Sequence, residues 1–298
     1  MKTLVIGSAI LDMILQVEQV PKSGEDIFAQ NPNTRIGGCA YNVASTLSNL
    51  GCEHDLCVPI GEGMCADRIK EELVRKGYPL LIQEVGQDNG FCLCMVDEYG
   101  ERTFVTVQGV EGRFESRWLK QIPIQEYDNI YLSGYQVCGE GAYIIVDWLE
   151  NVRGGSIYFA PGPVICKIEP TILNQIFKLR PILHLNEKEL LDYTQASSLE
   201  EGVKTLYEKT QNKMIVTLGA NGAIYWDGKQ LLQIPSMQAN VVDTIGAGDS
   251  HIGAILGYTS KGIGMEESIR NANKVAAGVV GIQGSIMEKE EFEKWMEE

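Results

Sequence analysis

The chain has 298 residues, of which 44% are hydrophobic, and a formal net charge of −15. This size suffices for one large α/β domain or two small ones. The negative charge argues against nucleic acid or an anionic membrane as the main partner, because phosphate groups need a basic face. No apolar run is long enough to span a bilayer. The eight scattered cysteines and the absence of a signal-peptide pattern lead us to expect a protein of the reducing cytoplasm.

Short apolar runs alternate with amphipathic helical patterns along the chain. The runs, bounded by Gly, Pro or Asn, are residues 4–7, 56–60, 130–132, 157–160, 182–185 and 214–218. Helical patterns cover residues 67–76, 142–151 and 199–210. Apolar strands separated by helices are typical of a parallel sheet that is covered on both faces. Since no linker interrupts them, we expect a single domain over residues 1–298.

Two segments break this alternation. Residues 13–36 carry a loose strand pattern, and residues 90–107 have the pattern of a hairpin with its turn at 97–100. Strands inserted into a βαβ chain usually cover a site. We therefore predict a small β-sheet lid with strands at about 13–36 and 90–107. An extension at the edge of the main sheet is the alternative.

The first candidate site residues follow the first strand. Asp12 lies a few residues beyond it, where open α/β sheets bind ligands. Its carboxylate can accept hydrogen bonds from two neighbouring hydroxyls. Gly37 and Gly38 precede a helical pattern and would let a ligand lie against bare backbone, while Asn42 offers a donor and an acceptor. The spacing leaves open a solvated Asp12 and an ordinary turn with an exposed Asn42.

Two later strand ends also carry polar residues. Asn186 and Glu189 fit a helix capping box, and the same pair could orient a hydrated Mg²⁺, which keeps waters and takes few protein ligands. The stretch from Thr217 through Gly219 to Gly222 follows the next strand. It would line a nucleotide, or form only a hairpin into the strand that follows.

The most informative stretch is Asp243-Thr244-Ile245-Gly246-Ala247-Gly248-Asp249, which precedes an apolar helical pattern. Amides at a helix start have no internal partner and carry partial positive charge. Small residues let an anion approach these amides closely. Asp249, beside such an anion cradle, suits proton acceptance rather than anion binding. The stretch therefore indicates phosphoryl transfer to a hydroxyl.

The chain has no Walker A sequence, no G-x-G-x-x-G after the first strand and no G-x-S-x-G elbow. Its motifs instead resemble, in order, those of the PfkB (ribokinase-like) family of carbohydrate and nucleoside kinases. The likeness rests on Gly37 and Gly38 with Asn42, on the N-x-x-E pair Asn186 and Glu189, on Thr217 with Gly219, and on 243–249. It covers nearly the whole chain and implies a ribokinase-like three-layer α/β/α sandwich, with a mostly parallel central sheet and a small β-lid.

The resemblance also implies a role for each site residue. Asp249 would be the general base, and the amides of Gly246, Ala247 and Gly248 would form the anion hole for the γ-phosphoryl group of ATP. The substrate's hydroxyls would be bound by Asp12, Gly38 and Asn42. Asn186 and Glu189 would place Mg²⁺ through its waters. ATP would contact Asn186, Thr217, Gly219, Gly222 and Asn273, the last beside adenine.

Many family members bind a monovalent cation such as K⁺ beside the anion-hole turn. The resemblance implies Asp243 and the carbonyl of Ile245 as ligands, with the carbonyls near Ile282 and Gly284 as candidates. In several relatives the lid also pairs two subunits, so a homodimer through the β-lid is expected.

Two positions depart from the family pattern. His251 stands where many relatives have an aromatic residue, and either a packing role or a proton relay would fit it. Gln136 aligns with an acid that touches the sugar in ribokinases, which argues against plain ribose. A modified sugar, a sugar acid or a nucleoside remains, with Tyr41 or Tyr135 available to stack on a base.

The leading hypothesis is ATP-dependent phosphorylation of a hydroxymethyl group on a sugar or sugar-like substrate. A nucleoside or pseudouridine kinase is the alternative, and apolar or aromatic groups on the substrate side of the lid would favour it. A sugar-phosphate kinase would need more basic residues near the substrate than Lys22 and Arg35. A non-catalytic sugar sensor is a remote alternative, because a sensor does not need Asp249.

Overall fold

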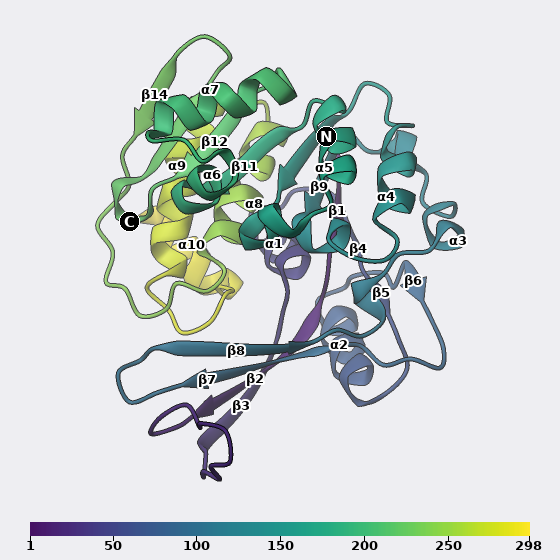
Figure 1. Cartoon of the computed structure of the whole chain (residues 1–298), viewed down its shortest axis with the longest axis vertical. Coiled ribbons are helices and arrows are strands. Elements are labelled where there is room, and N and C mark those ends of the chain that lie inside the picture. Colours follow the sequence, from purple (N-terminus) through teal and green to yellow (C-terminus); the bar gives the residue numbers. More distant parts are fainter.

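The computed structural model describes residues 1–298 and centres on an eight-stranded sheet between two layers of helices (Figure 1). Its strand order is β14-β13-β12-β11-β10-β9-β1-β4. The strands are β1 (Thr3–Ile6), β4 (His54–Cys57), β9 (Asn129–Ser133), β10 (Ser156–Ala160), β11 (Ile182–Asn186), β12 (Met214–Thr217), β13 (Ala223–Trp226) and β14 (Leu231–Ile234). The six neighbouring strands β12, β11, β10, β9, β1 and β4 pair in parallel. Strand β13 runs antiparallel to β12, and β14 runs antiparallel to β13. The six predicted apolar runs all fall on or beside strands.

The two faces of this sheet support separate hydrophobic clusters. Because successive strand residues point to opposite faces, Leu4 and Ile6 join one cluster and Val5 joins the other. The first cluster includes residues of α3 (Ser116–Leu119), α4 (Ala142–Leu149), α5 (Pro170–Lys178), α6 (Glu187–Thr194) and α7 (Leu199–Thr210). The second includes residues of α1 (Cys39–Asn49), α2 (Met64–Arg75), α8 (Ala247–Ser260), α9 (Met265–Val279) and α10 (Lys289–Glu297). None of the helices combines the length and the apolar composition that crossing a bilayer requires.

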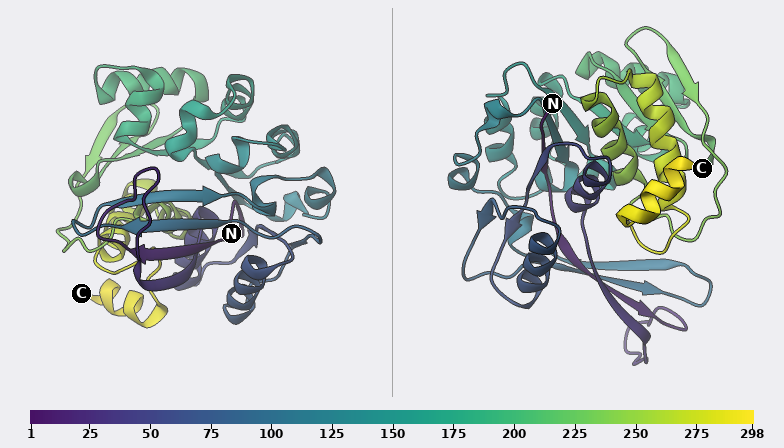
Figure 2. Two further views of the ribbon diagram at one scale, coloured as in Figure 1. Left: turned by 60° about the horizontal axis from the view of Figure 1, so that its bottom comes forward. Right: turned by 180° about the vertical axis from the view of Figure 1, so that it is seen from behind.

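The lid is a second, four-stranded sheet that projects from one end of the body (Figures 1 and 2). Its order is β3-β2-β7-β8, and the pair β2 and β7 is parallel. The strands are β2 (Ile10–Gln16), β3 (Gln30–Gly37), β7 (Phe91–Val96) and β8 (Arg102–Val107). A two-stranded ladder of β5 (Pro59–Ile60) and β6 (Ile82–Gln83) lies apart from both sheets. The predicted sandwich with a lid is confirmed, and the alternative of an edge extension is wrong.

Glu111 anchors the point where β7 leaves the body and β8 returns to it. Its buried carboxylate accepts hydrogen bonds from the amides of Gly90 and Gly109, each at 2.9 Å, and from the Asn89 side chain at 3.1 Å. Gly90 has no room for a side chain, since a Cβ would lie 2.1 Å from the carbonyl oxygen of Val107. Three donors satisfy this carboxylate without a cation and hold both chain segments together.

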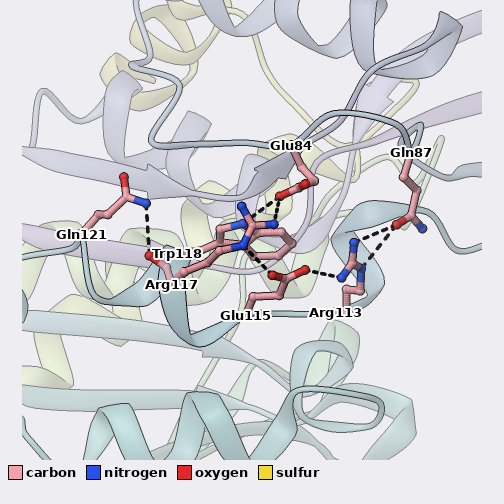
Figure 3. A network of polar contacts seen from close by, with 7 residues as sticks. All are labelled: Glu84, Gln87, Arg113, Glu115, Arg117, Trp118 and Gln121. Atoms are coloured by element: carbon pink, nitrogen blue, oxygen red, sulfur yellow. Dashed lines mark hydrogen bonds and ion pairs between the residues drawn. The ribbon is translucent and has the colours of Figure 1, made fainter.

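A polar network around Trp118 fixes α3 beside the loop after β6 (Figure 3). The guanidinium carbons of Arg113 and Arg117 lie 5.5 and 5.6 Å from the centroid of the Trp118 ring. The indole nitrogen donates to Glu84 at 3.1 Å, and Glu115 pairs with both arginines. Since exposed ion pairs contribute little, burial of the indole ring supplies most of the stability here.

Candidate active site

The predicted anion cradle lies at the start of α8, near the carboxyl ends of the parallel strands. Gly246 precedes the helix in the left-handed conformation, with φ +77°. The amides of Gly246 and Gly248 donate to no other group of the protein, and the Ala247 amide reaches the carbonyl of Thr244 only at 3.4 Å. Three clustered donors without good partners are what an anion would satisfy.

The two glycines of this turn have different surroundings. A Cβ on Gly246 would lie 2.4 Å from Cβ and 2.7 Å from Cα of Ser285, so the turn packs against that residue. No atom lies within 4 Å of a Cβ built on Gly248, which faces open space. Gly246 therefore shapes the turn, and Gly248 leaves the approach to it free.

Asp249 is held by a short chain of hydrogen bonds. Its Oδ2 accepts from Nδ2 of Asn42 at 2.8 Å, and Oδ1 of Asn42 in turn accepts from Oγ of Ser285 at 2.9 Å. Burial raises the pKa of Asp249 to about 6, although the hydrogen bond from Asn42 and the nearby Cys39 thiol favour the ionised form. A carboxylate with this pKa is ionised at neutral pH and can still accept a proton.

Asn42 reaches the aspartate because α1 starts at the predicted glycine pair. Gly38 has φ +102°, and a Cβ there would lie 2.5 Å from the carbonyl oxygen of Ser8. Only glycine allows this approach, which brings the first turn of α1 beneath α8. Asn42 is buried and engaged by two partners, so the interpretation of a merely exposed side chain is wrong.

Asp12 lies on β2 in the lid, paired in register with Arg35 of β3 and Cys92 of β7. Its carboxylate packs over Gly37, where a Cβ would come within 2.1 Å of Oδ2. Desolvation by burial raises the pKa of Asp12 to about 6, and no cation or hydrogen-bond donor of the protein offsets it. A partly buried carboxylate without a partner is available to a ligand.

Asn186 and Glu189 form the capping box that their spacing predicts. Oδ1 of Asn186 accepts from the Glu189 amide at 2.8 Å, while the Glu189 carboxylate accepts from the amide and side chain of Asn186 at 3.0 and 2.8 Å. Each carboxylate oxygen keeps a lone pair. Burial raises the pKa of Glu189, and its side chain lines the same cavity as Asp249. Capping and a water-mediated Mg²⁺ contact are therefore compatible.

Two cavities meet at Gly248. The larger, about 700 Å³, is lined by Thr217, Gly219 and Gly222 and by residues 236–241. The smaller, about 180 Å³, contains Asp249 and Glu189. The turn after β12 thus both forms the hairpin into β13 and lines a cavity. No Lys or Arg lines either cavity, so an anionic ligand would find amide dipoles and no fixed positive charge.

His251 belongs to a buried chain of hydrogen bonds. Asn273 donates to the carbonyls of Ile234 and Pro235, so its Oδ1 accepts from Nε2 of His251 at 3.0 Å. Nδ1 of His251 then accepts from Nε2 of His184 at 2.8 Å. Burial lowers the pKa of His251 to about 4, so the ring is neutral. Both ring nitrogens of His251 bind partners other than Asp249, which supports a packing role over a proton relay. Asn273, which lines the larger cavity, holds its wall in place through these hydrogen bonds.

Two predicted ligand contacts, those of Tyr41 and Gln136, are wrong. Tyr41 is 1% exposed and donates to Glu72 at 2.6 Å, so it cannot stack on a ligand. Gln136 is buried and donates to the carbonyl of Glu111 at 3.5 Å, away from both cavities. Tyr135, the other stacking candidate, lines the smaller cavity with Asp249. The strand end after β9 therefore presents Tyr135 to the site, where the alignment suggested Gln136.

Asp243, predicted to hold a monovalent cation, is surrounded by donors. Its Oδ1 accepts from the Ile245 amide at 2.8 Å and from the guanidinium of Arg102, while Oδ2 accepts from the Gly284 amide at 2.9 Å. Ile245 and Gly284 thus turn their N–H groups toward the carboxylate. The contacts of Asp243 do not fit a cation ligand, because an arginine already lies against it.

Three residues near the site were not identified from the sequence. Cys39 lies beside Asp249, Ser285 orients Asn42, and Arg102 reaches Asp243 from the lid. Only Cys39 carries a local signal, since it follows the glycine pair directly.

Comparisons with known proteins agree with this geometry. The model of the pfkB family of carbohydrate kinases matches residues 2–291. The uncharacterised sugar kinase YegV of Escherichia coli K12 is 34% identical over 285 residues, which cover 94% of this chain and 89% of that protein.

Solved structures extend the likeness to the fold. Ribokinase of Thermotoga maritima superposes with a TM-score of 0.84 at 24% identity, covering 100% of this chain and 99% of its own. A nucleoside kinase of Methanocaldococcus jannaschii gives a TM-score of 0.82 at 19% identity, covering 99% and 98%. The chain therefore belongs to the pfkB family of carbohydrate kinases, and it is an ATP-dependent phosphotransferase with a ribokinase-like fold.

Proposed function

We propose that this kinase transfers the γ-phosphoryl group of ATP to a hydroxymethyl group of a sugar or sugar-like substrate. The observation that carries the proposal is the position of Asp249. Its carboxylate is fixed by Asn42 next to the unpartnered amides of Gly246 and Gly248. A proton acceptor and an anion cradle in contact are the two parts that transfer to an alcohol requires.

In this mechanism Asp249 accepts the proton of the attacking hydroxyl. The amides of Gly246, Ala247 and Gly248 stabilise the charge on the transferring group, so catalysis rests on positioning and electrostatics. Asn42 keeps the carboxylate in place through its own bond to Ser285.

ATP would occupy the larger cavity, with its phosphates directed toward Gly248, where the cavities meet. Thr217, Gly219 and Gly222 line it, and Asn273 braces its wall. Since no Lys or Arg lines either cavity, the phosphate charge beside two carboxylates calls for a divalent cation. Asn186 and Glu189 would hold Mg²⁺ through its waters, and the ion would offset charge on the phosphate oxygens.

The substrate would lie between the body and the lid, with its hydroxyls on Asp12, Asn42 and the backbone at Gly38. The partner-free carboxylate of Asp12 supports this assignment. Gln136 is buried away from the cavities, so its identity is not an argument against plain ribose as the substrate.

A nucleoside kinase is the second candidate, because apolar side chains lie on the substrate side of the lid. Directly paired residues share a face of a sheet, so Cys92, Cys94, Phe104 and Thr106 lie on the side of Asp12. Arg102, on the same side, contacts the body, so this face looks toward the site. Cys92, Cys94 and Phe104 of this face, with Tyr135 in the smaller cavity, suit a nucleobase. Asn33 and Arg35 of β3 lie on the same face and suit the hydroxyls of a sugar.

The deciding experiment is a coupled assay of ADP release with Mg-ATP over pentoses, hexoses, sugar acids and nucleosides, followed by ³¹P NMR of the product. We expect one class to give turnover and a phosphate monoester on a primary carbon. Preference for nucleosides would promote the second candidate. Tight binding of a sugar with no ADP release from any acceptor would contradict the kinase proposal and favour a sensor.

The outer face of the lid further supports a homodimer. It carries Met13 and Leu93 with Val105 and Val107, and the two valines are 49% and 46% exposed. An apolar sheet face left open to water is a site of association. A second copy of the chain would cover it symmetrically.

We expect Val105→Lys to convert a dimer to a monomer in sedimentation velocity, because a charge would lie in the apolar interface. Tyr143→Lys is the matched control, since Tyr143 is also 49% exposed but lies on α4. A wild-type monomer at all concentrations, or equal effects of both variants, would dismiss the lid interface.

Because all eight cysteines are free thiols, we also assign the protein to the reducing cytoplasm.

A further inference from the structure

The carboxylate of Asp243 is a buried acid next to the anion-hole turn. Its side chain is only 4% exposed and lies two residues before Ile245, whose amide it binds. The Gly284 amide binds the other oxygen. The carboxylate thus joins the start of the turn to the loop after α9. Two neutral amides alone would leave a full negative charge in a poorly hydrated place.

The positive charge that meets Asp243 comes from the lid. Arg102 is the first residue of β8, and its guanidinium contacts Oδ1 of Asp243 across 141 positions of sequence. The arginine side chain is 22% exposed, so the pair is largely shielded from solvent. A pair in such a setting is much stronger than an exposed one, and loss of one member is costly.

A bound monovalent cation would need a free oxygen of Asp243 at this place. The Arg102 guanidinium and the Ile245 amide both bind Oδ1, and the Gly284 amide takes one of the two acceptor directions of Oδ2. The arginine thus already supplies the positive charge with which a cation would neutralise this carboxylate. The charge balance is therefore already complete within the chain. Addition of K⁺ would place two cations on one carboxylate.

We propose that the Arg102 guanidinium replaces a bound monovalent cation in this enzyme, by supplying the positive charge next to Asp243. Arg102 is a positioning residue: its charge fixes Asp243, Asp243 fixes the Ile245 amide, and the turn then presents its amides at 246–248 to the transferring group. The effect on turnover rests on the proposed function. The effect on stability does not, because it follows from the buried carboxylate alone.

The test compares wild type, Arg102→Ala and Arg102→Lys in KCl titrations at constant ionic strength, balanced with tetramethylammonium chloride. Wild-type turnover should change by less than about twofold across the KCl titration, since Arg102 already supplies the positive charge. Arg102→Ala should lose roughly 10²-fold in kcat and regain part of it with K⁺ or guanidinium. Arg102→Lys should stay cation-independent and more active than Arg102→Ala, because it restores the charge.

Thermal unfolding gives a readout that needs no substrate. Arg102→Ala should melt about 10 °C below wild type in tetramethylammonium, and K⁺ should raise its Tm while leaving wild type unchanged. The matched control is Arg35→Ala, because Arg35 also reaches from the lid and packs beside Gly284, but it donates to the carbonyl of Gln283 and to no carboxylate. It should acquire no dependence on K⁺.

Two outcomes would overturn the proposal. One is activation of the wild type by K⁺ at constant ionic strength, or a rise of its Tm with K⁺. The other is an Arg102→Ala variant whose Tm and turnover do not respond to any cation. If no acceptor is phosphorylated at all, the proposed function fails, and the Tm series still decides the role of Arg102.

Discussion

Replacing Asp249 with asparagine is expected to lower kcat by roughly 10²–10⁴-fold, the usual contribution of a general base. The amide has nearly the same shape and can still pack against Asn42, but it cannot accept the proton of the attacking hydroxyl. Substrate affinity, measured by calorimetry, should largely survive. Turnover near the wild-type value would remove Asp249 from the role of base.

Asp12→Asn is the matched control, because Asp12 has the same raised pKa and belongs to the substrate side. It should raise KM more than it lowers kcat, as expected for a residue that only binds.

The pH profile checks the same assignment. The wild-type kcat/KM should be level above about pH 7 and fall with decreasing pH below about 6, because Asp249 with its raised pKa must be deprotonated to act. Asp12 titrates in the same range and would steepen the fall. The residual activity of Asp249→Asn should lack the Asp249 contribution to this fall. An unchanged profile in that variant would point to another base.

Gly246→Ala is expected to impair both folding and turnover. The left-handed backbone at Gly246 costs a residue with a side chain about 1–2 kcal/mol, and overlap with Ser285 adds to this. Displacement of Ser285 also loosens Asn42, and with it Asp249. We expect kcat to fall by roughly 10²–10³-fold, the size seen when an oxyanion donor is lost, with a lower midpoint in urea unfolding.

Gly248→Ala separates the two effects. No atom lies within 4 Å of the added methyl group, and alanine is favoured over glycine in a helix by about 0.5–1 kcal/mol. Stability should therefore be unchanged or higher, while the methyl group obstructs the approach of the phosphoryl group. A fully active Gly248→Ala enzyme would mean that phosphate does not pass over this residue.

The elements of the fold were predictable because their signals are local. Apolar runs and helical periodicity depend on neighbours within one or two turns, so β1, β11 and α7 emerged close to their observed bounds. The glycine turns before α1 and α8 were found for the same reason. The confirmed lid was predicted from the loose strand pattern at 13–36 and the hairpin pattern at 90–107, which are also local signals.

Other parts of the site depend on contacts that the sequence does not mark. Arg102 lies 141 positions from Asp243, and Ser285 lies 243 positions from Asn42, so only the tertiary fold joins them. The error at Gln136 has a different cause. A short 3-10 turn over Gly134–Val137 follows β9 and turns Gln136 into the interior, which an alternating strand pattern does not predict.

Glu111 and Arg102 lie at opposite ends of the same ribbon, which makes the lid a lever. Glu111 clamps the end of β7 and β8 that is next to the body, while Arg102 is at their far end, where β8 begins. Six strand residues give an arm of roughly 17 Å. A rotation of about 10° at the pivot would then move Arg102 by about 3 Å, enough to break its pair with Asp243. An arm of this length would therefore convert a slight tilt at the base of the lid into separation of Arg102 from Asp243.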